Sequence, residues 1–172
     1  INFKMKLLYD KSSYLCSKVV TKSYSTSFSI AVNMLSPKIR EAIYSIYGFV
    51  RLSDEIVDSF HDFDKKKLIN SFESDYYEAM EEGISLNPIL NSFVLTVKKY
   101  QITDDLIQHF LNSMKSDLSN SVLITKEEYD NYIYGSADVV GLMCLKVFVN
   151  CDQKNYEKLK EPAMRLGSAF QK

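Results

Sequence analysis

The spacing of the apolar residues constrains this chain most, because it follows the period of an α-helix along almost the whole length. Leu68, Phe72, Tyr76 and Met80, for example, recur at every fourth position. The sustained alternation of apolar and polar residues that is typical of a half-buried strand is absent from the sequence. The pattern therefore predicts an all-α fold. Helices are expected at roughly 6–22, 37–60, 64–82, 88–100, 103–119, 126–149 and 153–171.

Glycine and proline are sparse and lie mostly where these helices should begin or end. Ser36–Pro37 and Asn87–Pro88 each place a capping residue before a proline at the first helical position. Gly83 follows a helical run and can form its C-terminal cap, and Thr125 with Glu128 has the spacing of a capping box. Because no repeat, low-complexity tract or linker interrupts these signals, we expect the 172 residues to form a single helical domain.

The composition predicts a soluble intracellular protein. A net charge of −1 lacks the basic excess of a nucleic-acid binder. Three widely spaced cysteines do not form a disulfide framework, which indicates a reduced, cytoplasmic setting. No apolar run approaches the ~18 residues of a membrane span, and no signal peptide is recognisable. His61 and His109 lack the spacing of zinc ligands, and the sequence contains neither a glycine-rich phosphate loop nor a Gly-x-Ser-x-Gly elbow.

The strongest chemical signal is an acidic pair in an otherwise apolar helix. Asp54 and Asp58 lie about 40° apart around the helix and one turn apart along it, and Tyr47 and Arg51 precede them on the same stripe. If both carboxylates face an apolar cleft, they are costly unless a cation lies between them. Mg²⁺ prefers oxygen ligands and completes its shell with substrate phosphate, which the guanidinium of Arg51 could also hold. The alternative is a solvated acidic face, which Glu55 favours.

Two further patterns each allow two interpretations. A stripe with small side chains in its middle permits either tight helix packing or the close approach of a long, slender ligand. Its members are Tyr132, Ser136, Ala137, Val140, Gly141 and Cys144. Asp138, beside this stripe, is expected at the surface. The run Thr26–Ser29 could contact phosphate through its hydroxyls, or it could be a helix exit in which serine competes for backbone hydrogen bonds.

Four blocks of the chain resemble the squalene/phytoene synthase family, in the family's order and spacing. The residues in these blocks are most like those of its bacterial phytoene synthases. The blocks are Ser25–Ser29, Ile46–Asp58, Tyr132–Gly141 and Arg165–Gln171. The resemblance implies the all-α isoprenoid synthase fold, which is a helical bundle around a central cavity with acidic motifs at its mouth. This chain would be its N-terminal part.

The resemblance also implies roles for individual residues. Asp54 and Asp58 match the first aspartate-rich motif and would bind Mg²⁺, with Mn²⁺ as an alternative ion. Arg51 and Tyr47 would lie near the diphosphate, and Tyr132 would lie at the reacting centre. The remaining matches are a substrate-binding segment, Ser25, Ser27 and Phe28, and residues that would line the prenyl tunnels, Ala137, Val140, Gly141, Gly167 and Gln171.

The sequence departs from the family pattern in three places. Ala137–Asp138 replaces an Ala-Gly pair, which leaves the pocket near position 138 open, and Tyr24 stands where some relatives have a histidine. The second aspartate motif is expected just after Gln171, where the chain ends. We therefore expect a truncated chain that holds half of the metal site and is inactive alone.

The implied activity is the Mg²⁺-dependent, head-to-head condensation of two prenyl diphosphates. The first expectation is that two geranylgeranyl diphosphates give phytoene, in carotenoid biosynthesis and without NADPH. Squalene or dehydrosqualene synthesis from farnesyl diphosphate is the alternative. A head-to-tail prenyltransferase or terpene cyclase and a helical interaction module are the rivals. We expect prenyl diphosphates and no nucleic acid as partners, and peripheral membrane contact is a hypothesis. The oligomeric state is left open.

Overall fold

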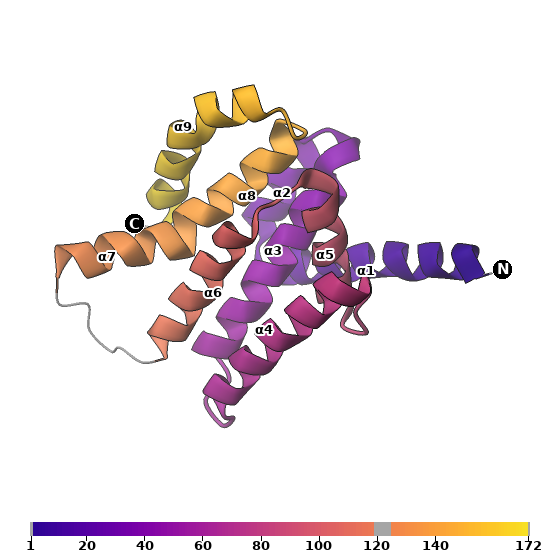
Figure 1. Cartoon of the computed structure of the whole chain (residues 1–172), viewed down its shortest axis with the longest axis horizontal. Coiled ribbons are helices and arrows are strands. Elements are labelled where there is room, and N and C mark those ends of the chain that lie inside the picture. Colours follow the sequence, from indigo (N-terminus) through magenta and orange to yellow (C-terminus); the bar gives the residue numbers. More distant parts are fainter. Residues whose placement is uncertain (1, 119–124, 172) are drawn as a thin grey trace. The chain divides into compact units, whose positions relative to one another are not determined.

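The computed structural model describes the backbone of residues 2–118 and 125–171 and the side chains of residues 5–118 and 125–169. Every regular element in these ranges is helical, so the all-α prediction is confirmed (Figure 1). The elements are α1 (Asn2–Tyr24), α2 (Thr26–Met34), α3 (Pro37–Asp58), α4 (Lys65–Glu82), α5 (Pro88–Tyr100), α6 (Asp104–Asp117), α7 (Lys126–Ile133), the π-helix η1 (Tyr134–Asp138), α8 (Val139–Phe148) and α9 (Gln153–Gln171).

Local sequence signals set most of the helix ends. The helices α3 and α5 begin at the two prolines, as predicted. The side-chain oxygen of Asn87 accepts a hydrogen bond from the amide of Ile89 at 3.0 Å. The capping box before α7 is formed, because Thr125 and Glu128 each accept a hydrogen bond from the other's amide. Gly83 ends α4 with a φ of 77°, which glycine adopts without strain.

Two helices differ from the prediction. The run at Thr26 is not a helix exit, because α2 begins there after a one-residue break at Ser25. Ser25 has an extended φ of −146°, and its side chain accepts from the amide of Phe28, as expected for an N-cap. The helix expected at 126–149 contains the wider π-helical turn η1, which divides it into α7 and α8. Gly135 in this turn lies so close to α6 that a Cβ there would be 2.9 Å from the carbonyl oxygen of His109.

The chain divides into two compact units. Unit 1 comprises Ile1–Leu52 and Phe72–Lys99, and unit 2 comprises Ser53–Ser71 and Tyr100–Lys172. The boundaries fall inside α3 and α4, so each unit holds part of both helices. The expectation of a single domain stays a prediction.

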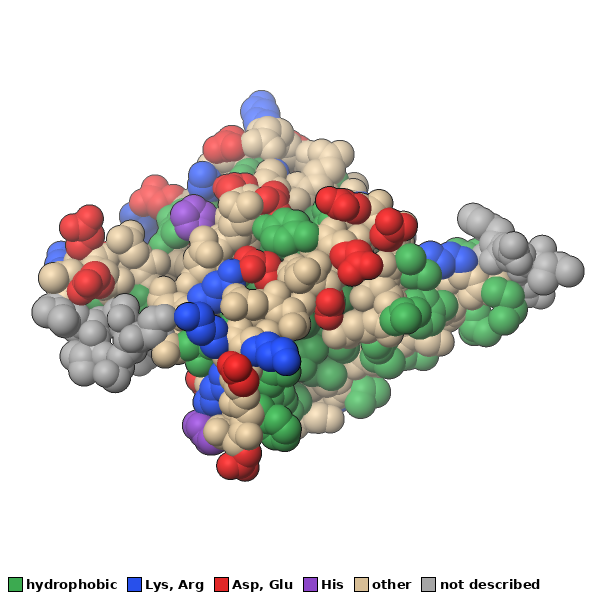
Figure 2. All heavy atoms as spheres, turned by 60° about the horizontal axis from the view of Figure 1, so that its bottom comes forward, with side chains coloured by type: hydrophobic (Ala, Val, Ile, Leu, Met, Phe, Trp, Pro, Cys, Tyr) green, Lys and Arg blue, Asp and Glu red, His purple; other side chains and the backbone are tan. Residues whose placement is uncertain are grey.

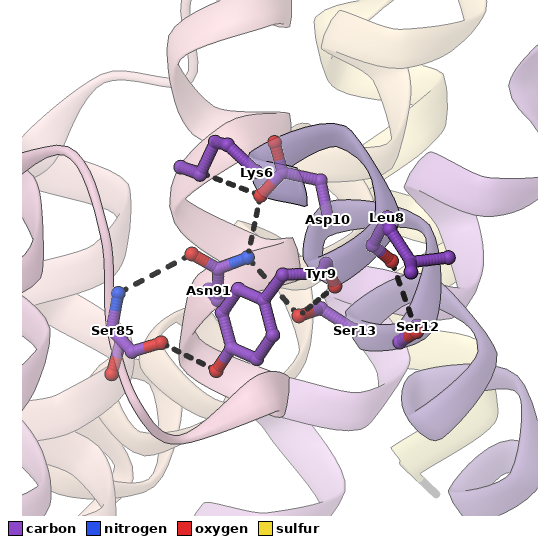
Figure 3. A network of polar contacts seen from close by, with 8 residues as sticks. All are labelled: Lys6, Leu8, Tyr9, Asp10, Ser12, Ser13, Ser85 and Asn91. Atoms are coloured by element: carbon purple, nitrogen blue, oxygen red, sulfur yellow. Dashed lines mark hydrogen bonds and ion pairs between the residues drawn. The ribbon is translucent and has the colours of Figure 1, made fainter. Parts of the chain in front are cut away.

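Unit 1 has an aromatic centre and a polar seam. Phe49 stacks on Phe93 with ring centroids 3.9 Å apart, and both side chains are fully buried. The seam joins α1 to α5 (Figure 3). In it, the amide of Asn91 donates to Asp10 at 3.0 Å and to Ser13 at 3.1 Å. These bonds satisfy polar groups that burial would otherwise make costly.

Unit 2 is built on α6, η1, α8 and α9. The helices α7 and α8 follow one another along one direction, and α9 turns back beside them (Figure 1). Leu142 and Met143 of α8 and Ile107 and Leu111 of α6 are fully buried. Their burial supplies the apolar core of this unit.

One face of α1 is apolar and exposed. Met5, Leu8, Leu15 and Val19 are 58% to 63% exposed, and their spacing places them on one stripe of the helix. Hydrophobic side chains are visible along α1 in Figure 2. Within the described residues, no helix combines the length and the apolar character that crossing a bilayer requires.

Candidate functional site

The acidic pair lies at the C-terminal end of α3, in unit 2. Asp54 is half-buried and Asp58, the last residue of the helix, is exposed. The prediction that both carboxylates face an apolar cleft is therefore wrong for Asp58. The helix stops at that residue, so solvent reaches it, whereas the two preceding residues, Ile56 and Val57, are buried. The ammonium group of Lys65 donates to the carbonyl of Val57 at 2.6 Å and so caps this helix end.

A third carboxylate lies near this pair. Asp117 is the last residue of α6 and is half-buried. Burial raises the pKa of Asp117 to about 6, a hydrogen bond from Tyr132 opposes that increase, and the charges of Asp58 and Asp54 add to it. The end of α6 therefore adds a third carboxylate to the negative charges of Asp54 and Asp58. The sequence spacing gave no sign of this third carboxylate.

Tyr132 brings a phenol to the same place. Its hydroxyl donates to Oδ2 of Asp117 at 3.3 Å, which is long for a hydrogen bond between oxygens. Burial raises the pKa of Tyr132 above its ordinary value, and the charge and hydrogen bond of Asp117 and the charge of Asp58 act in the same direction. Tyr132 is thus a neutral phenol at neutral pH, held beside acidic groups. Sequence reasoning selected Tyr132, and the structure adds its partner.

The carboxylates do not form a closed metal cage. Within the described ranges, no three side chains of His, Cys, Asp or Glu come together as a metal-binding group. Mg²⁺ commonly binds through one or two carboxylates, several waters and the phosphates of a substrate. The donor set of Asp54 and Asp58 is therefore of the kind that fits an ion shared with a diphosphate.

Three of the predicted substrate-binding residues of unit 1, Phe28, Tyr47 and Arg51, make contacts with aromatic rings. Phe28 of α2 stacks on Tyr47 of α3 with centroids 4.7 Å apart, and both are half-buried. The guanidinium of Arg51 lies 4.4 Å from the ring centroid of Tyr24, a cation–π contact. Tyr24 had no predicted role, and its exposed position at the end of α1 gave no sign of this contact.

The two predicted serines behave differently from each other. The hydroxyl of Ser25 is engaged in the N-cap of α2, where it accepts from the amide of Phe28 at 3.2 Å. Ser27, in the first turn of α2, is exposed. Ser27 is thus open to solvent, whereas Ser25 has a structural role, and their binding roles stay predictions.

The small residues predicted to line prenyl tunnels lie where α9 packs on η1 and α8. A Cβ at Gly141 would be 2.8 Å from the carbonyl oxygen of Ala163, and a Cβ at Gly167 would be 2.7 Å from that of Ala137. The tight-packing interpretation of the stripe that contains Gly141 is thus observed at that glycine, and Gly167 of α9 approaches the facing backbone equally closely. The tunnel-lining role of these residues and of the half-buried Val140 stays a prediction.

Two further residues complete the comparison with the sequence. Asp138 is not at the surface as expected, because it is 8% exposed and accepts a hydrogen bond from Ser168 of α9 at 2.5 Å. This bond satisfies the aspartate that replaces glycine here and ties η1 to α9. Gln171 belongs to α9, but its side chain lies outside the described residues.

Comparisons with known proteins identify the family. The squalene/phytoene synthase family model matches residues 21–172. The chain is 27% identical to phytoene synthase 2, chloroplastic, of Zea mays, over 95% of the chain and 40% of that protein. It is 27% identical to phytoene synthase of Arthrospira platensis, over 92% of the chain and 54% of that protein. It is 24% identical to 4,4'-diapophytoene synthase of Staphylococcus haemolyticus (strain JCSC1435), over 94% of the chain and 56% of that protein.

Solved structures show the same fold. A dehydrosqualene synthase in complex with a ligand matches with a TM-score of 0.81 and 20% identity, over 94% of the chain and 55% of its own. Squalene synthase HpnC from Alicyclobacillus acidocaldarius matches with a TM-score of 0.81 and 20% identity, over 95% of the chain and 60% of its own. The expected isoprenoid synthase fold is thus confirmed over part of those structures.

The matches cover most of this chain but only part of its relatives. The chain spans about half the length of these curated relatives, between 40% and 56%. The family model, in contrast, covers well over half of the chain and includes all four blocks that carry the resemblance. The chain therefore belongs to the squalene/phytoene synthase family, prenyltransferases that generally depend on Mg²⁺ and condense prenyl diphosphates head to head.

Proposed function

We propose that the protein containing this chain condenses two molecules of geranylgeranyl diphosphate into phytoene. The observation that carries the proposal is the grouping of Asp54, Asp58 and Asp117 with the neutral phenol of Tyr132. The pair of Asp54 and Asp58, with the negative charge of Asp117 near it, attracts a divalent cation, and a cation there neutralises a diphosphate leaving group. Phytoene is favoured over other products because the relatives from Zea mays and Arthrospira platensis are named phytoene synthases.

The chemistry follows from the residues in their proposed roles. Asp54 and Asp58 hold Mg²⁺, which supplies the charge neutralisation that lets diphosphate leave. Arg51, one turn before Asp54 in α3, donates to a phosphate oxygen. The carbon–oxygen bond of the first substrate breaks, diphosphate keeps the electron pair, and the double bond of the second substrate attacks the allylic cation.

The remaining steps need no reductant for phytoene. A proton is lost as a cyclopropyl intermediate forms, this intermediate loses the second diphosphate and rearranges, and loss of a second proton gives the hydrocarbon. Tyr132 is proposed to steer a proton at the reacting centre, because its phenol oxygen is held beside the acidic group. Squalene, in contrast, requires hydride from a nicotinamide cofactor.

A second candidate is dehydrosqualene synthesis from farnesyl diphosphate. The Staphylococcus haemolyticus relative is named 4,4'-diapophytoene synthase, and one matching structure is a dehydrosqualene synthase. The two candidates share every residue role above and differ in the length of the prenyl chain. Only the product distinguishes them.

The test is incubation of the complete natural protein with Mg²⁺ and either geranylgeranyl or farnesyl diphosphate, followed by mass spectrometry of the extracted hydrocarbon. We expect phytoene from the longer substrate. A C30 hydrocarbon from farnesyl diphosphate alone would support the second candidate instead. A cyclic terpene or a longer linear prenyl diphosphate would overturn head-to-head condensation, and the absence of any Mg²⁺-dependent diphosphate release would overturn the enzymatic proposal.

We also propose a cytoplasmic location with loose membrane contact, because the product is lipophilic. The exposed apolar stripe of α1, Met5, Leu8, Leu15 and Val19, gives such contact a surface. Flotation with liposomes should carry part of the protein into the lipid fraction. Its complete absence from that fraction would contradict membrane contact and leave the enzymatic proposal untouched.

A further inference from the structure

Asp117 occupies a place where a carboxylate is unfavourable for stability. It ends α6, where the partial negative charge of the helix C-terminus repels an anion. It is half-buried, and the charges of Asp58 and Asp54 act on it. Carboxylates that lie partly buried and close to like charges occur often at functional sites.

The structure gives this carboxylate a specific partner. The hydroxyl of Tyr132 donates to Oδ2 of Asp117, and the two residues belong to different helices, α7 and α6. The backbone of Tyr132 is held independently, because its carbonyl accepts from the hydroxyl of Ser136 at 2.8 Å and from that of Ser113 at 3.4 Å. The carbonyl of Tyr132 thus has serine hydroxyls as partners, whereas its phenol hydroxyl donates to Asp117.

We propose that Asp117 is the positioning residue for Tyr132, and that it holds the phenol oxygen in a fixed direction near Asp58 during the condensation. The proposal rests on the proposed function, because Tyr132 must act on the substrate for its orientation to matter. Asp117 acts through the phenol and is neither a catalytic residue nor a metal ligand. It lies outside all four sequence blocks that carry the family resemblance.

The experiment is steady-state kinetics on the complete natural protein with Mg²⁺ and prenyl diphosphate. Asp117→Ala removes the acceptor, whereas Asp117→Asn keeps an oxygen of the same reach without the charge. We expect Asp117→Ala to lower kcat by about 10- to 100-fold, with the KM for prenyl diphosphate and the half-saturating Mg²⁺ concentration within about 3-fold of wild type. Asp117→Asn should recover most of kcat. The matched control is Asp130→Asn, which removes an exposed carboxylate from α7 and should leave kcat unchanged.

A double-mutant cycle distinguishes positioning from a general structural role. In a Tyr132→Phe background no hydroxyl is left to orient, so adding Asp117→Ala should change kcat by less than about 3-fold. Fully additive losses would overturn the proposal, and so would an Asp117→Ala variant with wild-type kcat. A variant that recovers full kcat at high Mg²⁺ would also overturn it, because Asp117 would then act as a metal ligand.

Folding of each variant is checked by circular dichroism. If Asp117→Ala does not fold, the same cycle is run with Asp117→Glu, which keeps the charge but moves the acceptor oxygen away from the phenol. Asp117→Glu should then lower kcat in the wild-type background and have little effect in the Tyr132→Phe background. Equal losses of kcat in the two backgrounds would overturn the proposal in the same way.

Failure of the proposed function and failure of the positioning role are distinguishable. If the wild-type protein itself forms no hydrocarbon, the proposed function fails first. If the wild-type protein turns over and Asp117 shows no coupling to Tyr132, only the positioning role is defeated.

Discussion

The burial of Asp117 at the end of α6, to which the charges of Asp58 and Asp54 add, has a measurable consequence. The folded protein holds the proton of Asp117 more tightly than the unfolded chain does, because the pKa is raised from 3.8 to about 6. The stabilisation of the folded state by protonated Asp117 is fully present below about pH 4 and is lost as the pH rises through 6.

Asp117→Asn removes this dependence on pH. Because the side chain is only half-buried, solvent screening reduces the effect to about 1 kcal/mol. The free energy of unfolding of the wild type, relative to that of the variant, should therefore fall by about this amount between pH 4 and pH 7. Urea unfolding at several pH values measures the difference. A constant difference across this range would contradict the raised pKa.

At the level of single residues, the sequence predicts what lies within one helix and misses what lies between helices. That Asp54 and Asp58 lie on the same side of their helix follows from the helical period alone. The bond between Tyr132 and Asp117 joins residues 15 positions apart on different helices, so no local pattern indicates it. The exposure of Asp58 was also missed, because the exact end of α3 decides whether water reaches that side chain.

Among the elements, the contact of α9 with η1 and α8 depends on backbone approach at two glycines. Alanine at a helical glycine normally stabilises by about 1 kcal/mol. At Gly141 and Gly167, however, the new Cβ would meet carbonyl oxygens of the facing backbone, which cannot rotate away. We therefore expect Gly141→Ala and Gly167→Ala each to destabilise the protein by about 1–3 kcal/mol.

Thermal unfolding followed by circular dichroism measures this effect. Lys160→Ala is the control, because this side chain is exposed on the same helix, α9, and its removal should change stability by less than about 0.5 kcal/mol. Glycine variants as stable as this control would show that α9 does not pack closely on η1 and α8.

The polar seam between α1 and α5 provides a second test at this scale. Asn91 is 1% exposed, donates to Asp10 and Ser13, and accepts from the amide of Ser85 at 3.3 Å (Figure 3). Asn91→Ala removes these three hydrogen bonds of a buried side chain. We therefore expect a loss of about 2 kcal/mol in the free energy of unfolding.

The matched control for this seam lies on α1. The hydroxyl of Ser12 is exposed and bonds only within its own helix, to the carbonyl of Leu8. Ser12→Ala should therefore change stability by less than about 0.5 kcal/mol. Equal denaturation midpoints for the two variants would show that the seam does not hold α1 to α5.

The element pattern also shows where sequence reasoning succeeds. Proline, glycine and capping-box signals fixed the starts of α3, α5 and α7 and the end of α4, because each acts through backbone geometry within a few residues. The π-helical turn η1 was not predicted. Gly135 within this turn lies close to α6, and a tertiary contact of this kind leaves no local pattern in the sequence.

At the scale of the whole molecule, the fold and the family agree, while the product depends on parts that are proposals. The chain belongs to a prenyltransferase family and shares the all-helical fold of the matching structures over the region compared. The division into two compact units, with α3 and α4 contributing to both, leaves the acidic group of α3 in unit 2 together with Asp117 and Tyr132. The contacts argued for these residues therefore lie within one unit.

The most direct test of the central claim is Mg²⁺-dependent release of diphosphate by the complete natural protein and by its Asp54→Asn and Asp58→Asn variants. The control, Glu55→Gln, removes a carboxylate from a different face of the same turn of α3. We predict that each aspartate variant loses at least about 100-fold in kcat, whereas the control stays within about 3-fold of wild type. Wild-type turnover in Asp54→Asn would contradict the claim that this helix turn carries the metal and the leaving diphosphate.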